Sequence, residues 1–358
     1  MKPPASIATP LATFGLTVCL ALSLAGCASV GSTYGETTGV PATGVYVIQD
    51  TAANGTTAAS GSVLQFSASA TGAATPVSII ANTNVTSLAL LATDGLGDIY
   101  TTSTQSTVGT SLIEYPGGST NNAQPIRSIP FNATTKLGAL NGLTADSTGG
   151  LYAPEDSGGV AIFSSTANGS VAPNGYILGD SQTGGGLSTL LVANAATTDA
   201  SGNLYVIDAG VGVTKPIVVF SATAVGNVAP IRSIGGALTT MAAGTPHSIA
   251  TDTAGNLYVA NIVSGVSSIL VFDSTASGNT SPLRDITGSS TLLGCAGGIA
   301  VDTEGGYLYV VSTPTCGDTA NPTILKFSTI GTGNIAPISS FNSTAWTNAD
   351  PTLSIAVY

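Results

Sequence analysis

Charged side chains are scarce in this 358-residue chain. Only 7% of its residues are Asp, Glu, Lys or Arg, whereas about 25% is usual for a soluble domain. The 7 Lys and Arg residues cannot supply the basic surface that neutralises nucleic-acid phosphates, which excludes nucleic-acid binding. The hydrophobic fraction of 43% nevertheless gives the chain enough apolar surface to bury a core.

Side chains that carry out catalysis are equally few. His247 is the single histidine, and no nucleophile-elbow motif accompanies it, so a Ser-His-Asp arrangement is excluded. No glycine-rich phosphate loop precedes an expected helix. The chain is instead rich in Gly, Ser, Thr, Ala and Val, a composition that favours short strands joined by tight turns.

The N-terminus carries an export motif. An apolar run from Leu11 to Leu24 is too short to span a bilayer and ends in small residues, which is typical of a cleaved signal peptide. The sequence Leu24-Ala-Gly-Cys27 resembles the lipobox of bacterial lipoproteins. This resemblance implies cleavage before Cys27 and attachment of lipid to its thiol, which would anchor the protein to a membrane. An ordinary secretory signal with a chance cysteine is the alternative.

This interpretation divides the chain into three parts. Residues 1–26 are the expected signal peptide, residues 27–43 a flexible Ser/Gly/Thr-rich tether, and residues 44–358 the folded domain. Ala28 follows the cysteine, and by resemblance to enterobacterial sorting this residue favours the outer membrane. The expected location is therefore the cell envelope, facing the periplasm or the surface.

Two cysteines remain after Cys19 leaves with the signal and Cys27 is lipidated. They are Cys295 and Cys316, and in an oxidising compartment a leftover pair is expected to form a disulfide. Two free thiols, or a metal site completed by other residue types, are the alternatives.

Two sequence units recur at intervals of about 50 residues, a period typical of propellers and solenoids. The first unit is Asp-x-x-Gly-x-Leu-Tyr, with one extra residue in its fifth copy, and its aspartates are Asp94, Asp146, Asp199, Asp252 and Asp302. The second unit starts at an aromatic residue and reaches a proline some ten residues later. Its aromatics are Phe66, Tyr115, Phe163, Phe220, Phe272 and Phe327.

The two ends of the chain supply the missing sixth copy of the first unit. Residues 353–358 match residues 246–251, the strand before a turn aspartate, and residues 44–48 match the strand after one. A closed ring splits a repeat in this way because its last strand completes its first blade. We therefore predict an all-β fold: a six-bladed β-propeller of four-stranded antiparallel blades, closed by pairing of the N- and C-terminal strands.

The repeats resemble the NHL-repeat propeller superfamily, whose pattern is approached by Gly298-Ile-Ala-Val-Asp302 and Gly255-Asn-Leu-Tyr-Val-Ala-Asn261. The resemblance implies the propeller fold over residues 44–358. It leaves activity open, because that superfamily holds lyases, lactonases and pure binding modules.

The repeated aspartates are tempting as metal ligands. Because an identical residue in every blade serves that blade's own turn, we expect Asp252 and its equivalents to bond backbone N–H groups, with Gly255 at positive φ. Function is expected where the blades differ, at the mouth of the central channel.

Four residues are the candidates for a ligand site at this mouth. Asn141, Asn194 and His247 lie five residues before their turn aspartates, at the starts of three consecutive inner strands, and Asp208 ends a second strand nearby. Related lactonases and lyases bind a divalent cation at about this position. Glu155, Asp156 and Asn261 end the neighbouring second strands, and the aromatics Phe341 and Trp346 either anchor a ligand or pack the last loop.

Two functions remain open. The favoured one is a membrane-anchored, extracytoplasmic binding module for a protein, peptide, glycan or small ligand, without a cofactor and without catalytic residues. The alternative is a metal-assisted lyase or lactonase in which His247, Asn194 and Asn141 hold a divalent cation. No metal ligand set is complete enough in the sequence to be assigned.

Overall fold

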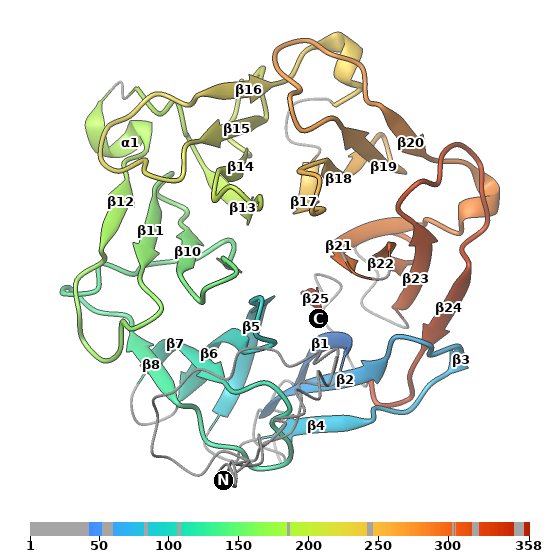
Figure 1. Cartoon of the computed structure of the whole chain (residues 1–358), viewed down its shortest axis with the longest axis horizontal. Coiled ribbons are helices and arrows are strands. Elements are labelled where there is room, and N and C mark those ends of the chain that lie inside the picture. The colour runs from blue at the N-terminus through green and yellow to red at the C-terminus, as the bar shows by residue number, and fades with distance from the viewer. Residues whose placement is uncertain are drawn as a thin grey trace, which may run out of the picture. The chain divides into compact units, whose positions relative to one another are not determined.

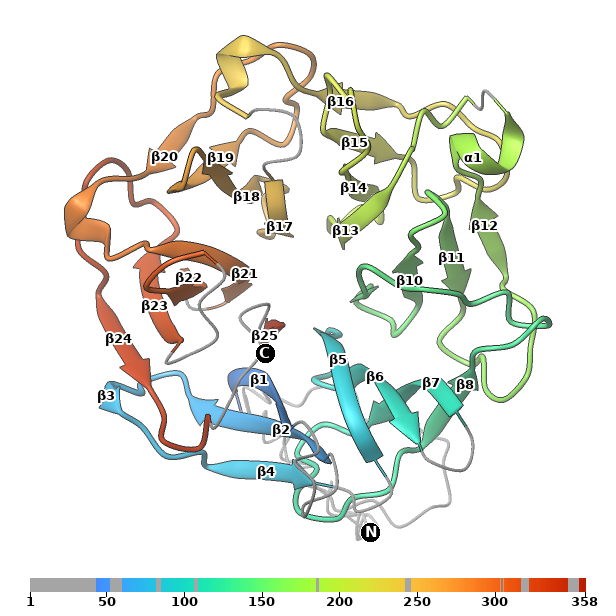
Figure 2. The same cartoon turned by 180° about the vertical axis from the view of Figure 1, so that it is seen from behind.

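The repeated units build a ring of sheets. The computed structural model describes residues 43–51, 60–81, 85–105, 109–184, 187–241, 246–302, 304, 306–316, 322–346 and 354–358. These residues form six sheets arranged around a central axis, which Figures 1 and 2 show from opposite sides. The four strands of each blade run antiparallel to their neighbours, so the predicted six-bladed β-propeller is confirmed.

Each blade is described from the channel outward. Blade 1 consists of β25 (Ile355–Val357), β1 (Gly44–Thr51), β2 (Ser60–Ser67) and β4 (Ser78–Ala81). Blade 2 consists of β5 (Val85–Thr93), β6 (Ile99–Gln105), β7 (Gly109–Tyr115) and β8 (Arg127–Pro130). Blade 3 consists of β9 (Thr144–Ala145), β10 (Leu151–Pro154), β11 (Val160–Phe163) and β12 (Gly175–Ile177).

The other three blades follow the same plan. Blade 4 consists of β13 (Ala193–Thr198), β14 (Leu204–Asp208), β15 (Ile217–Phe220) and β16 (Arg232–Ile234). Blade 5 consists of β17 (Pro246–Thr251), β18 (Leu257–Val263), β19 (Val266–Phe272) and β20 (Arg284–Ile286). Blade 6 consists of β21 (Cys295–Asp302), β22 (Tyr307–Thr313), β23 (Thr323–Ser328) and β24 (Ser339–Asn342), with β3 (Gly72–Ala73) added in parallel. Helix is confined, in these described residues, to α1 (Asp180–Thr183) and two 3₁₀ turns (Ala237–Thr239 and Ser289–Thr291).

The ring closes through the two ends of the folded domain. Strand β25 pairs antiparallel with β1, with Val357 opposite Val45 and Ile355 opposite Val47. The Gly44 N–H also donates to the carbonyl of Tyr358 at 2.8 Å. The C-terminal strand is thus the innermost strand of blade 1, as the split repeat predicts.

The hydrophobic core lies between neighbouring blades rather than inside any one of them. Six clusters of buried side chains each join two adjacent blades, and the cluster between blades 4 and 5 packs Ile217 and Phe272 together. The six aromatics that begin the second unit are all below 2% exposed; they are Phe66, Tyr115, Phe163, Phe220, Phe272 and Phe327. Burying one such ring stabilises the fold by about 1.5–3 kcal/mol, so this single repeat position holds each blade to the ring.

The outer edge of each blade is covered by the next blade. In blade 4, Ser233 accepts a hydrogen bond from the Gly278 N–H at 2.6 Å, and Ile234 pairs in parallel with Gly278, which lies in a turn of blade 5. Gly278 adopts φ +66°, a conformation that favours glycine. The equivalent residues, six positions after each repeated aromatic, all have positive φ; they are Gly72, Asn121, Gly169, Gly226, Gly278 and Gly333. This contact, the outer clasp, protects sheet edges that would otherwise invite pairing with another chain.

Basic side chains reinforce the contacts between blades. Arg127 pairs with Glu114 at 2.7 Å and donates to the carbonyls of Gly149 and Ser164 in blade 3. Lys326 in blade 6 donates to the carbonyl of Ala68 in blade 1 at 3.0 Å. These few cations therefore act as structural links and are not offered to a ligand.

Candidate functional site

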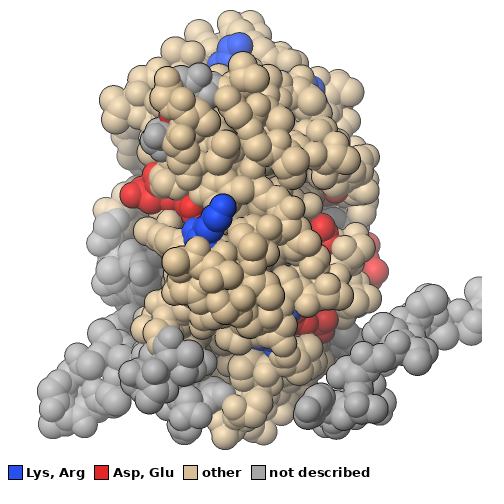
Figure 3. Space-filling model, turned by 90° about the vertical axis from the view of Figure 1, so that its left-hand side faces the viewer, with Lys and Arg blue, Asp and Glu red and all other residues tan. Residues whose placement is uncertain are grey.

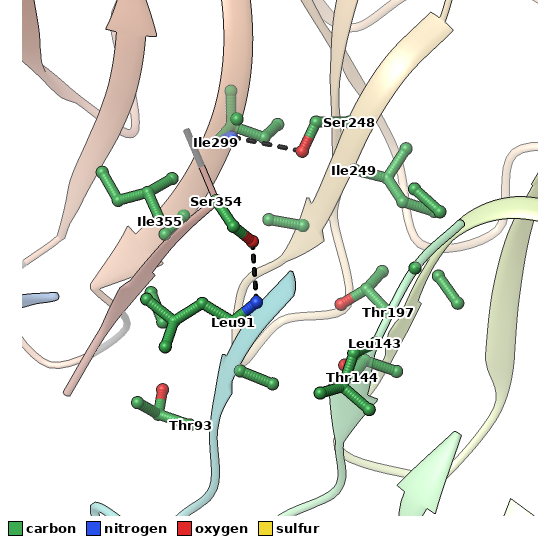
Figure 4. A pocket seen from close by; sticks show the side chains of 18 of the residues that line it. Leu91, Thr93, Leu143, Thr144, Thr197, Ser248, Ile249, Ile299, Ser354 and Ile355 are labelled. Carbon is green, nitrogen blue, oxygen red and sulfur yellow. Dashed lines mark hydrogen bonds between the residues drawn. The ribbon is translucent and has the colours of Figure 1, made fainter. Parts of the chain in front are cut away.

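The inner strands surround a channel with a volume of about 2130 Å³. Figure 4 shows that aliphatic side chains such as Leu91, Ile249 and Ile355 share its wall with the hydroxyl-bearing side chains of Thr144 and Thr197. No Lys or Arg lines it among the described residues. The space exceeds the 300–1,000 Å³ of an ordinary small-molecule pocket, so it suits a segment of chain or an elongated ligand.

Hydroxyl groups close the free edges of the inner strands. The Leu91 N–H donates to Ser354 Oγ at 2.8 Å, and the Ile299 N–H donates to Ser248 Oγ at 3.2 Å, both across a blade boundary (Figure 4). Thr251 donates to a carbonyl of blade 4 at 2.8 Å. These bonds satisfy backbone groups that would otherwise face the channel unpaired, and they make its wall a rigid frame.

One end of the channel is formed by the Asp-x-x-Gly turns. Asp252 Oδ1 accepts the Asn256 N–H at 2.9 Å, while its Oδ2 accepts the hydroxyl of Tyr258 at 3.1 Å. Gly255 has φ +78°, as expected. The other turn aspartates likewise accept N–H groups of their own turns; they are Asp94, Asp146, Asp199 and Asp302. Because these oxygens are already used, the turn interpretation is confirmed over a shared metal site at this end, here called the turn end.

The opposite end of the channel, here called the start end, is where the blades differ. Asn141, Asn194 and His247 all line the channel there. Asn141 is half-buried, and its Nδ2 donates to the carbonyl of Ala193 in the next blade at 3.2 Å. The His247 side chain is exposed to the channel, yet the surrounding protein reduces its solvation and lowers the pKa of the imidazole below its ordinary value. This end therefore presents amides and a largely neutral imidazole at pH 7.

Asp208 is not brought together with these three residues. Its side chain is 2% exposed and accepts the N–H groups of Leu191, Val192 and Gly210. It pairs in register with the buried Ala193 and is not among the residues that line the channel.

The other ends of the second strands behave in the same way. Glu155 is buried and accepts hydrogen bonds from Ser157 and Tyr176, while Asn261 is 1% exposed. Among the described residues, no three His, Cys, Asp or Glu side chains gather as a metal site needs. Asn141, Asn194 and His247 contribute no carboxylate, which Ca²⁺ and Mg²⁺ sites ordinarily include. The described part of the start end thus offers two amides and one imidazole.

A disulfide joins Cys295 to Cys316 across 21 positions of sequence, which confirms the predicted pairing. Both cysteines line the start end of the channel. The bridge holds the first residue of β21 to the loop after β22. It therefore fixes the blade 6 side of the mouth, next to blade 5, which carries His247.

The two late aromatics pack inside the fold. Phe341 is 3% exposed and Trp346 is 7% exposed. Their rings lie 5.2 and 5.5 Å from that of Phe66. They fill the boundary between blades 6 and 1, so the packing interpretation is confirmed and the ligand-anchor interpretation is wrong.

The fold and its channel place the chain in the class of six-bladed β-propellers, and its fold is similar to that of a solved structure from Bacteroides caccae. A protein of unknown function from Bacteroides caccae is 10% identical with a TM-score of 0.54, over 88% of this chain and 98% of that one. A protein from Lactobacillus plantarum is 14% identical with a TM-score of 0.49, over 84% and 83%. The WD40 propeller domain of Doa1 is 10% identical with a TM-score of 0.44, over 78% and 82%. No family model and no curated protein matches the chain.

The export motif lies outside the described residues. This applies to the signal peptide over residues 1–26, to Cys27 and to residues 28–42 of the expected tether. In the part that the structure does describe, no helix has the length and apolar character needed to cross a membrane.

Proposed function

We propose that this protein is a lipid-anchored binding module of the cell envelope, with its ligand site at the start end of the channel. The observation that carries the proposal is the break in the repeat. The turn aspartates serve their own blades, whereas the start-end positions of blades 2 to 6 vary and carry Ala89, Asn141, Asn194, His247 and Gly297, which all line the channel. Side chains that depart from a structural repeat in this way are expected to serve a ligand.

The chemistry of the start end favours a neutral, extended ligand such as a peptide segment of another protein. Amide groups on Asn141 and Asn194 both donate and accept hydrogen bonds, as a peptide backbone requires. No cation lines the described channel, so an anionic ligand has no counter-charge there. Tyr358 is the one aromatic ring in the described channel lining, so a glycan would find few of the rings on which sugars stack.

Anchoring is supported by the lipobox-like sequence ending at Cys27. Labelling of cells with radioactive palmitate tests the anchor. We expect label on the protein, and no label on a Cys27→Ala variant. An unlabelled wild-type protein would refute the anchor.

A display library of random peptides tests the ligand site. We expect peptides selected on the immobilised protein to bind an Asn141→Ala/Asn194→Ala/His247→Ala variant about tenfold more weakly or worse, which corresponds to about 1.4 kcal/mol of lost contacts. A Ser147→Ala/Ser201→Ala variant, altered at the turn end of the same channel, is the matched control and should keep full affinity. Equal affinity for both variants would refute a site at the start end.

A further inference from the structure

The outer surface of blades 6, 1 and 2 carries no exposed charge among the residues described there. We call residues 60–81, 109–131 and 322–346 the neutral sector. They include three charged side chains, Glu114, Arg127 and Lys326. Glu114 and Arg127 are buried and paired at 2.7 Å. Lys326 is half-buried, donates to a backbone carbonyl and has its Nζ 3.6 Å from the centre of the Tyr307 ring.

Large aliphatic side chains are exposed along the same sector. Val77, Ile79 and Ile126 are 63, 42 and 52% exposed, and Ile330 and Ile338 are 79 and 59% exposed. The outer clasp joins these blades edge to edge, since β24 pairs with β3 and Ile80 pairs with Asn121. Figure 1 shows β24, β3, β4 and β8 following one another along one edge of the ring. The side chains therefore belong to one uninterrupted side of the molecule.

Blades 4 and 5 show which features of the neutral sector recur elsewhere in the ring. Ile231 and Leu283 occupy the same repeat position in blades 4 and 5 and are 54 and 55% exposed. There, however, the neighbouring outer strands and turns carry Arg232, Asp285 and the exposed Asp273. Figure 3 shows such isolated charges on another side of the ring. Exposure of the aliphatic residue is thus common to the repeat. Residues 157–179 of blade 3 also lack charged side chains, but they carry no exposed large aliphatic residue, so the neutral sector combines both features.

The folded domain begins next to this sector, in β1, which pairs with β2 of the sector. Strand β1 starts at Gly44 in blade 1, and only sixteen residues separate it from Cys27. Sixteen residues span at most about 55 Å, so a lipid on Cys27 would keep the ring within one protein diameter of the bilayer. A surface held so close meets the membrane at a high effective concentration.

We propose that the neutral sector rests on the bilayer, with its aliphatic side chains in the interfacial region and the channel axis lying along the membrane. Apolar side chains gain from leaving water, and a sector without charge avoids the cost of moving ions toward hydrocarbon. The inference rests on the anchor part of the proposed function. It adds an orientation that leaves both ends of the channel open to the periplasm or the medium.

Fluorophores at matched positions of the lipid-bearing mature protein test the contact. Single variants Ile126→Cys and Ile338→Cys report on the sector, and Ile231→Cys and Leu283→Cys are the controls at equivalent positions. Each is labelled with an environment-sensitive dye and mixed with phosphatidylcholine vesicles that contain a lipid-borne quencher. We expect the two sector dyes to brighten with plain vesicles and to be quenched by the lipid-borne quencher, while the control dyes stay unchanged.

Flotation of the same samples keeps the two proposals separate. Protein that fails to float with the vesicles refutes the anchor, and the membrane contact with it. Protein that floats but gives the same signal at all four positions refutes the contact and leaves the anchor standing. Brightening of the sector dyes without vesicles, rising with protein concentration, would show that a second copy covers the sector and would also overturn the proposal.

Discussion

The two ends of the channel are built from the same six strands but by opposite rules. At the turn end, the same aspartate recurs from blade to blade, and its oxygens bond the turn that carries it. At the start end, the equivalent positions carry Asn141, Asn194 and His247. The difference teaches that a residue kept in every blade builds the fold, whereas a residue that varies is free to serve a ligand.

Removing β25, an inner strand that connects the two ends of the channel, should reduce the stability of the fold more than any other change. Deleting residues 354–358 removes β25, the buried Ile355 and the bond from Ser354 to Leu91. Truncating a single buried Ile already costs about 2–5 kcal/mol, so we expect the deletion to abolish cooperative unfolding. An Ile355→Val variant, expected to cost only about 1 kcal/mol, is the control. Unchanged urea unfolding of the deleted chain would contradict closure by β25.

Breaking the disulfide should weaken the start end without touching its polar residues. A Cys295→Ala/Cys316→Ala variant loses a bridge between residues 21 positions apart, which is worth about 3 kcal/mol in the chain-entropy model. Urea unfolding measures the loss, and reduction of the wild-type protein with dithiothreitol should reproduce it. Equal unfolding free energies of the oxidised wild type and the variant would show that the disulfide does not stabilise the fold.

Changing one turn aspartate tests the claim that the repeated aspartates stabilise their own turns. Asp252→Ala removes the acceptor of both the Asn256 N–H and the Asn256 side-chain amide and leaves the Tyr258 hydroxyl with the Thr329 carbonyl as its only acceptor, at an expected cost of about 1–3 kcal/mol in unfolding free energy. Asp252→Asn keeps one acceptor oxygen and should cost less. Equal melting temperatures of the two variants would show that the hydrogen bonds of the Asp252 carboxylate do not explain why an aspartate recurs at this position of the repeat.

The turn aspartate of blade 2, Asp94, lies near the buried ion pair of Glu114 and Arg127, so stability at this turn is expected to depend on pH. Burial raises the pKa of Glu114 to about 7, against the opposing pull of Arg127, and burial also raises the pKa of Asp94. The folded protein thus holds the Glu114 proton more tightly than the unfolded chain. Its contribution to stability is full below pH 4.5 and is lost as the pH rises through about 7.

A Glu114→Gln variant should therefore lose part of this pH dependence. We expect its melting temperature to fall less steeply than that of the wild type between pH 4.5 and pH 7.5. Melting curves followed by circular dichroism at matched ionic strength measure both slopes. Identical slopes would mean that Glu114 does not titrate in this range.

Much of the architecture was predictable because the repeat is regular. An aromatic residue followed by a proline, Phe220 and Pro230 in blade 4, recurs in every blade. The repeat copy that is split between the two ends of the chain predicted that the C-terminal strand closes the ring. The disulfide was predicted because Cys295 and Cys316 are the two cysteines that remain if Cys19 lies in a signal peptide and Cys27 carries lipid. The repeat units and the number of cysteines can be read from the sequence without knowing how the blades pack.

What escaped prediction depends on contacts between strands and blades. Asp208 was grouped with Asn194, but a bulge between Ala193 and Ala196 shifts the register there. A shift of one residue moves a side chain to the other face of a sheet. Arg127 lies in an Ile-Arg-Ser-Ile sequence that recurs at Arg232, yet its carbonyl partners lie in the next blade.

The most direct test of the account compares urea unfolding of two double variants. Asp199→Ala/Asp252→Ala removes two turn aspartates, and Asn194→Ala/His247→Ala removes the start-end residues of the same two blades. We expect the first variant to lose about 2–6 kcal/mol and the second less than about 1 kcal/mol. An equal or larger loss in the second variant would show that Asn194 and His247 are structural, which contradicts a ligand site at the start end.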